Sequence, residues 1–110
     1  MNDKYTKISE KLKAIAEPTR LKILEMLTKE EMCVCEVINK LSLSQPAVSH
    51  HLKILRQVDL IQDRKEGKWV FYSVNKTAYL KLIQTLQINF TIDKQLKEKQ
   101  KPTICCNIKL

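Results

Sequence analysis

Four cysteines in two close pairs are the residues of this 110-residue sequence that are best suited to chemistry. Cys33 and Cys35 are separated by one residue, and Cys105 and Cys106 are adjacent. Thiolates are soft ligands that select Zn, Cd, Pb, Cu(I) or the thiophilic As(III) over Mg or Ca. Pairs this close in sequence do not make a disulfide framework, so metal or redox chemistry is the better interpretation. The alternative for the first pair is two small buried apolar side chains.

The spacing of the first pair constrains the local structure. On a regular helix, residues i and i+2 lie about 200° apart around the axis. Cys33 and Cys35 therefore reach one ion only where the segment is extended or irregular. This places them where a short helix, marked by Val37, Ile38 and Leu41, begins.

A second group of polar side chains lies on an amphipathic helix that we predict from Gln45 to about Val58, with Ser44 as its N-cap. The buried face carries Val48, Leu52 and Leu55. The opposite face carries Gln45, Ser49, His50 and Lys53.

Polar side chains near a helix N-terminus are able to meet base edges in a major groove. Gln45 has the amide that pairs with adenine, and His50 has a donor for a guanine edge; the alternative for each is a solvated polar residue. His51 lies nearer the buried edge of the helix, which favours a hydrogen-bonded structural histidine.

A basic hairpin follows this helix. Residues 60–64 and 69–74 are two β-prone runs, and Gly67, the only glycine, supplies the positive φ of the turn at residues 65–68. Arg64, Lys65 and Lys68 are candidates for phosphate contact, and the alternative is a solvated turn.

Three further helices position these groups. The apolar residues of the first helix are Tyr5, Ile8, Leu12 and Ile15. The second helix starts at Pro18 and ends near Thr28, and its apolar face carries Leu21, Ile23, Leu24 and Leu27. The last helix follows a cap at residues 75–77, and the side chains that we expect inside are Tyr79, Leu80, Leu82, Ile83, Leu86 and Phe90. The first and last helices carry more apolar residues than one small domain covers, which predicts a homodimer.

The charge is +8 and is unevenly distributed. Residues 1–36 carry seven basic and seven acidic groups, residues 37–92 carry eight and three, and residues 93–110 carry five and two. A polyanion is therefore attracted to the middle and the tail.

We expect one domain at residues 1–90 and a basic, cysteine-bearing tail at 91–110. We also expect a cytoplasmic location, because neither a membrane-spanning run nor a signal-peptide run is found.

Short helices, a tight turn, a polar-faced helix and a basic hairpin are the order of a winged helix-turn-helix, a mainly α fold with a small β-hairpin wing, here about five helices and two strands. Three segments, residues 16–24, 43–55 and 67–72, resemble the ArsR/SmtB family of metal-responsive repressors in order and spacing. Residues 32–36 further resemble the cysteine motif of its arsenic- and cadmium-sensing members. The resemblance covers about residues 5–90 and implies a dimer on an inverted-repeat DNA operator.

The sequence departs from part of that family. Where an arsenic-type motif resembles Cys-Val-Cys-Asp-x-Cys, this chain has Val37 in the third cysteine position. The third thiolate must then come from Cys105 or Cys106, and the alternative for that pair is a tail with incidental thiols. The family's other site, a histidine and carboxylate cluster, is absent, because residues 77–89 contain no His, Asp or Glu.

The leading hypothesis is a repressor released when As(III) or Sb(III) binds the cysteine thiolates; Cd(II), Pb(II) and Zn(II) are alternative inducers. The second hypothesis replaces metal binding by thiol oxidation. An enzyme using Cys33 and Cys35 is disfavoured, because both histidines lie in the DNA-reading helix and no cofactor-binding glycine motif is present. A ligand-independent architectural DNA-binding protein leaves the cysteines unexplained.

Overall fold

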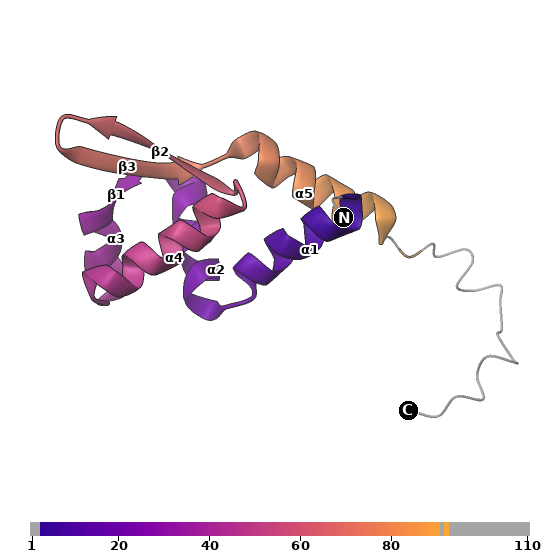
Figure 1. Ribbon diagram of the computed structural model, residues 1–110, viewed down its shortest axis with the longest axis horizontal. Helices are drawn as coiled ribbons and strands as arrows, with labels where there is room; N and C mark the ends of the chain where they lie inside the picture. Colours follow the sequence, from indigo (N-terminus) through magenta and orange to yellow (C-terminus); the bar gives the residue numbers. More distant parts are fainter. Residues whose placement is uncertain (1–2, 91, 93–110) are drawn as a thin grey trace, which may run out of the picture.

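The computed structural model describes residues 3–90 and residue 92. The elements in chain order are α1 (Lys4–Ile15), α2 (Pro18–Lys29), β1 (Met32–Cys33), α3 (Val34–Leu41), α4 (Gln45–Gln57), β2 (Ile61–Glu66), β3 (Trp69–Val74) and α5 (Lys76–Asn89). Within the described residues there are five helices and a small antiparallel sheet, with α2, α3 and α4 packed against the sheet and α1 and α5 toward the other end of the molecule (Figure 1). This confirms the winged helix-turn-helix prediction.

The helix boundaries follow from local chemistry. Asp3, Ser44 and Asn75 each accept a hydrogen bond from a backbone N–H in the first turn of α1, α4 and α5. Pro18 occupies the first position of α2, where its missing N–H costs nothing. Ser42, at φ 56°, ends α3 and leaves only Leu43 before Ser44 caps α4. The tight turn of the helix-turn-helix results.

The sheet differs from the two-stranded prediction by one short strand. Its order is β1-β3-β2, and β1 pairs with β3 through Met32 and Cys33. The hairpin turn is tighter than predicted, because Lys65 and Glu66 still pair with β3 and only Gly67 and Lys68 form the turn. Gly67 has the expected positive φ of 63°. The hairpin projects away from α1 and α5, which lie at the other end of the molecule (Figure 1).

The core lies among α2, α3, α4 and the bases of the strands. Its fully buried side chains are Ile23, Val37, Val48, Leu52, Leu55, Leu60 and Ile61. The outer helices contribute little, since Ala14 is the only buried residue of α1, and Leu82 is the only one among the α5 residues whose burial is described. Leu80, Ile83 and Phe90, which we predicted to be inside, are exposed to 55%, 39% and 62% in this single chain. Leu21 of α2, also placed on an apolar face, is half exposed.

Candidate DNA-binding and thiolate sites

The polar face of α4 is open along its length. Gln45, Ser49, His50 and Lys53 are exposed, whereas Val48, Leu52 and Leu55 are buried in the core. The division into two faces is therefore as the sequence indicates. Ser44 is exposed too, but its hydroxyl accepts a hydrogen bond from the Ala47 N–H at 3.3 Å, so it caps the helix as well.

His51 is held inside the fold, as predicted. Its Nδ1 lies 3.2 Å from Nη1 of Arg20 and 4.0 Å from Oε1 of Glu17. Because a guanidinium only donates, Nδ1 is the acceptor and the ring proton belongs on Nε2. Nε of Arg20 also donates to the Ala14 carbonyl. This cluster joins the end of α1, the start of α2 and the inner edge of α4.

Glu17 stabilises the same junction. Its carboxylate accepts a hydrogen bond of 2.8 Å from the Arg20 N–H, and this bond is the main cause that lowers the pKa of Glu17; the charge of Arg20 lowers it further. The segment between α1 and α2 is therefore fixed by charged groups as well as by Pro18.

The tip of the hairpin carries two exposed lysines. Lys65 and Lys68 are exposed on either side of Gly67. Nζ of Lys68 lies 5.8 Å from the ring centroid of Trp69, which is itself half exposed. Both ammonium groups are exposed, and exposure is necessary for the predicted phosphate contact.

Arg64, the third hairpin candidate, already has partners. Its guanidinium makes a two-pronged contact with Glu31, at 2.9 Å from Nε and 2.8 Å from Nη2, and a looser one of 3.5 Å with Glu66. It also covers the ring of Phe71 at 4.8 Å. The pair with Glu31 raises the pKa of Arg64 and lowers that of Glu31. Arg64 must therefore release the Glu31 carboxylate before its guanidinium can bind a DNA phosphate in its place.

The two thiols of Cys33 and Cys35 meet at the N-terminus of α3. Cys33 is the N-cap residue in an extended conformation, φ −84° and ψ 164°, and Cys35 follows in the first turn. Their Sγ atoms are 2.6 Å apart. The extended backbone at Cys33 is the irregularity that the Cys-x-Cys spacing demands, so this local prediction is confirmed.

The two sulfurs differ in environment. Cys33 is buried, with 7% of its surface exposed, while Cys35 is exposed. The hydrogen bond with Cys35, followed by burial, raises the pKa of the Cys33 thiol above its ordinary value. The backbone N–H of Cys33 donates to Oε1 of Glu36 at 2.9 Å, which fixes the first turn of α3 around the pair.

Cys33 is also part of the sheet, since it pairs with Phe71 across β1 and β3. Sequence reasoning missed this strand, because two residues carry no periodicity. It also missed Glu31 and Glu36. The signal for Glu36 is present, because a carboxylate three residues after a helix N-cap completes a capping box; no local pattern pairs Glu31 with Arg64.

Cys105 and Cys106 lie outside the described residues. Within the part of the chain that is described, no group of three or more His, Cys, Asp or Glu side chains is arranged to hold a metal ion. Cys33 and Cys35 supply two ligands, and a complete site needs others. No helix of the described segments is long and apolar enough to cross a membrane.

Known proteins share this arrangement of helices and strands. Residues 17–63, from the N-cap of α2 to the middle of β2, match the model of the bacterial regulatory protein arsR family. The uncharacterized HTH-type transcriptional regulator MJ1325 of Methanocaldococcus jannaschii is 47% identical over 73 residues, which cover 66% of this chain and 82% of the relative. This chain belongs to the arsR family. It is a transcriptional repressor that acts on DNA, and not an enzyme.

Two further comparisons extend over most of the chain. The arsenical resistance operon repressor of Staphylococcus aureus is 32% identical over 105 residues, 96% of this chain and 94% of that protein. The solved structure of HlyU from Vibrio cholerae superimposes with a TM-score of 0.68 at 38% identity, over 84% of this chain and 100% of HlyU. The family fold therefore includes α1 and α5 as well as the matched helix-turn-helix.

Proposed function

We propose that this repressor senses a soft metal or metalloid ion through the thiolates of Cys33 and Cys35, and that the bound ion releases it from operator DNA. As(III) or Sb(III) is the favoured inducer, and Cd(II), Pb(II) and Zn(II) are the alternatives. The observation that carries the proposal is the convergence of two sulfurs 2.6 Å apart at the N-terminus of α3. Soft thiolates in this position select soft ions.

The remaining ligands come from the tail in this proposal. As(III) and Sb(III) take three thiolates in a pyramid, so Cys105 or Cys106 of the basic segment 91–110 completes the set, and Cd(II) or Pb(II) uses all four. The 20 residues from Thr91 span up to about 66 Å when extended, so reach is no obstacle. The likeness to an arsenical resistance operon repressor over 94% of that protein favours the metalloid.

Ion binding at this position acts on both DNA-contacting elements. A tetrahedral ion with metal–sulfur bonds of about 2.3 Å holds two sulfurs roughly 3.8 Å apart, so a bound ion fixes the positions of the Cys33 and Cys35 sulfurs relative to each other. Cys33 is paired with β3 of the hairpin, and α3 packs against α4. This constraint therefore biases the wing and the recognition helix together. Only such a difference between the two states is able to shift operator affinity.

Coupling of about 1–3 kcal/mol is typical of allosteric proteins, whereas near-complete release needs roughly 5.5 kcal/mol. Two sites in one dimer bring the total close to that value.

The proposed dimer forms through exposed apolar residues of α1 and α5, among them Tyr5, Leu12, Leu80 and Ile83. It presents two α4 helices to major grooves about 34–36 Å apart, which requires an inverted-repeat operator.

In the proposed complex, α4 provides sequence specificity and the hairpin provides affinity. Gln45 and Ser49 contact bases, with His50 and Lys53 beside them. The remaining contacts, to phosphates, come from Ser44, Arg64, Lys65 and Lys68. Gln45→Ala should weaken operator binding far more than random-DNA binding, whereas Lys68→Gln should weaken both and lower the salt slope by about one.

The deciding experiment uses Cys33→Ser, Cys35→Ser and the double variant on a DNA fragment selected for binding to the reduced protein. Each variant should keep its DNA affinity and lose release by arsenite or Cd(II). Single changes at Cys105 and Cys106 should be partly redundant, and their double change should weaken sensing. A Cys33→Ser, Cys35→Ser protein that still leaves the DNA on addition of arsenite or Cd(II) contradicts the proposed site.

Thiol oxidation is the second candidate function, because the sulfurs of Cys33 and Cys35 are in contact. The direction of the Cys33 pKa disfavours it, since oxidation-sensing thiols have lowered rather than raised pKa values. Titration of metal-free protein with peroxide separates the two mechanisms. Release by peroxide in the presence of a chelator supports oxidation, and retention of DNA supports the ion.

A further inference from the structure

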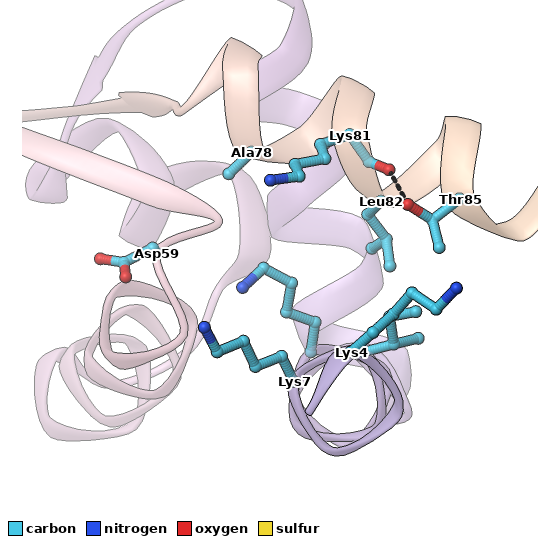
Figure 2. Close-up of a pocket in the computed structure, with 9 residues that line it drawn as sticks. Lys4, Lys7, Asp59, Ala78, Lys81, Leu82 and Thr85 are labelled. Atoms are coloured by element: carbon cyan, nitrogen blue, oxygen red, sulfur yellow. Dashed lines mark hydrogen bonds between the residues drawn. The ribbon is translucent and has the colours of Figure 1, made fainter. Parts of the chain in front are cut away.

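A second pocket lies far from the thiols, between α1 and α5, and has a volume of about 550 Å³. This size is within the usual range for small-molecule sites. We call it the lysine pocket; it is lined by Lys4, Lys7, Ile8 and Lys11 of α1, by Ala78, Lys81, Leu82 and Thr85 of α5, and by Asp59 from the turn after α4. Figure 2 shows Lys7 coming from α1 and Lys81 from α5, with Asp59 on the side of α4.

The pocket has an excess of positive charge. Lys7, Lys11 and Lys81 stand against the single carboxylate of Asp59, whereas Nζ of Lys4, which also lines the pocket, lies 5.1 Å from the ring centroid of Tyr5. Within the described residues, none of the four lysines forms an ion pair. Like charges gathered in one pocket repel one another, and an anion bound between them removes that repulsion.

The pocket also has an apolar floor. Leu82 is 5% exposed and belongs to the hydrophobic core, and Ile8 packs against that core. Ala78 lies on the same face of α5 as Leu82, and its small side chain leaves space beside Leu82. A ligand that fits both features has one anionic end and an apolar body. We propose that the lysine pocket binds an organic carboxylate of this kind, a medium-chain fatty acid.

A second copy of this chain does not suit the pocket. It would bring the same positive charge, which is unfavourable. Leu80, the most exposed apolar residue in the middle of α5, also lies on another face, since it precedes Leu82 by two residues, or about 200° around the helix. A dimer centred on Leu80 therefore leaves the pocket open to a small ligand. This inference is independent of the proposed ion sensing.

The test titrates the full-length, reduced and metal-free protein with octanoate by calorimetry at low salt. We expect saturable binding of one octanoate per protomer. Acetate, which lacks the apolar body, and 1-octanol, which lacks the charge, should each bind at least roughly tenfold more weakly, because each ligand loses one of the two interactions. Equally tight binding of 1-octanol or of inorganic phosphate would overturn the proposal, as would no saturable binding of octanoate.

A matched pair of variants locates the site. Lys7→Gln with Lys81→Gln should weaken octanoate binding roughly tenfold or more, because two charge-assisted contacts are lost. Lys22→Gln with Lys29→Gln removes the same charge from exposed positions of α2 and should leave binding unchanged. All four side chains are exposed, so the fold is retained. Equal weakening in both pairs would assign the effect to net charge and reject the lysine pocket.

Discussion

The helix-turn-helix unit, α2 to α4, and the outer pair of helices, α1 and α5, both carry apolar residues at helical spacing, but these residues differ in burial. In the unit, Leu52 and Leu55 are 1% and 0% exposed, because α2, α3 and the sheet cover them. In the outer pair, Leu80 and Tyr5 are 55% and 59% exposed. Apolar residues at helical spacing thus form a core where partners exist in the chain, and an exposed apolar surface, the proposed dimer interface, where they do not.

The largest effect is expected for charges on the outer pair. Leu80→Glu with Ile83→Glu should raise the dimer dissociation constant by roughly 10³-fold or more, because four half-exposed apolar side chains per dimer lose their burial. Sedimentation of the variant should show a monomer, and circular dichroism should show an intact fold. A variant that remains dimeric places the interface elsewhere.

A truncation in the unit should act on folding instead. Leu55→Ala should lower the free energy of unfolding by about 2–5 kcal/mol, because it leaves a cavity in a closed core. Leu12→Ala on α1 should cost about 1 kcal/mol or less, since that side chain is 36% exposed. Both changes are best compared by urea unfolding in the monomeric background described above. Equal losses would remove the distinction between unit and outer pair.

The protonation of the thiols gives the next largest effect, and it separates metal from metalloid. Because its pKa is raised, Cys33 holds its proton at neutral pH, and Cd(II) must displace it. Apparent Cd(II) affinity should therefore increase by about tenfold per pH unit for each proton released. Arsenite binds as As(OH)₃, whose hydroxyl groups leave as water with the thiol protons, so its affinity should not change with pH.

This response is measured by thiolate absorbance between about pH 6 and pH 8. Cys33→Ser is the internal control, because it removes the thiol whose proton is displaced and should therefore reduce the pH dependence of Cd(II) binding. A steep pH dependence for arsenite, or none for Cd(II), would mean that the thiol protons are not the groups displaced.

The smallest effect is expected at the helix caps. Ser44→Ala removes the hydroxyl that accepts from the Ala47 N–H and should lower the free energy of unfolding by about 1 kcal/mol. Asp3→Ala removes the equivalent bond to Thr6 at the start of α1, where local fraying precedes global unfolding. Chemical denaturation should detect the first change and scarcely the second. The opposite ranking would make α1 part of the cooperative unit.

Sequence reasoning succeeded where the determinants are local. The cap at Ser44, the start of α2 at Pro18 and the turn at Gly67 depend on a few neighbouring residues, and the structure has all three. The extended backbone at Cys33 followed from helix geometry alone. The inward position of His51 followed from its place at the edge of the buried stripe.

It failed where distant segments meet. The pairing of Met32 with Tyr72, the ion pair of Arg64 with Glu31 and the lysine pocket each join residues far apart in the chain. A list of apolar positions also does not say which partner covers them, so Leu80 and Ile83 were expected inside. The DNA-contacting and ion-binding roles of the named residues stay predictions.

The pairing of Cys33 with Phe71 limits how the chain tolerates insertions and deletions. Successive side chains of a strand point to opposite faces, so one residue added between Met32 and Cys33 would turn Cys33 to the other side of the sheet. The same residue added at Gly67 would only lengthen the hairpin tip. Cysteine-bearing segments transferred between proteins of this fold therefore need to keep their distance from Met32 to α3, while their wings are free to differ in length.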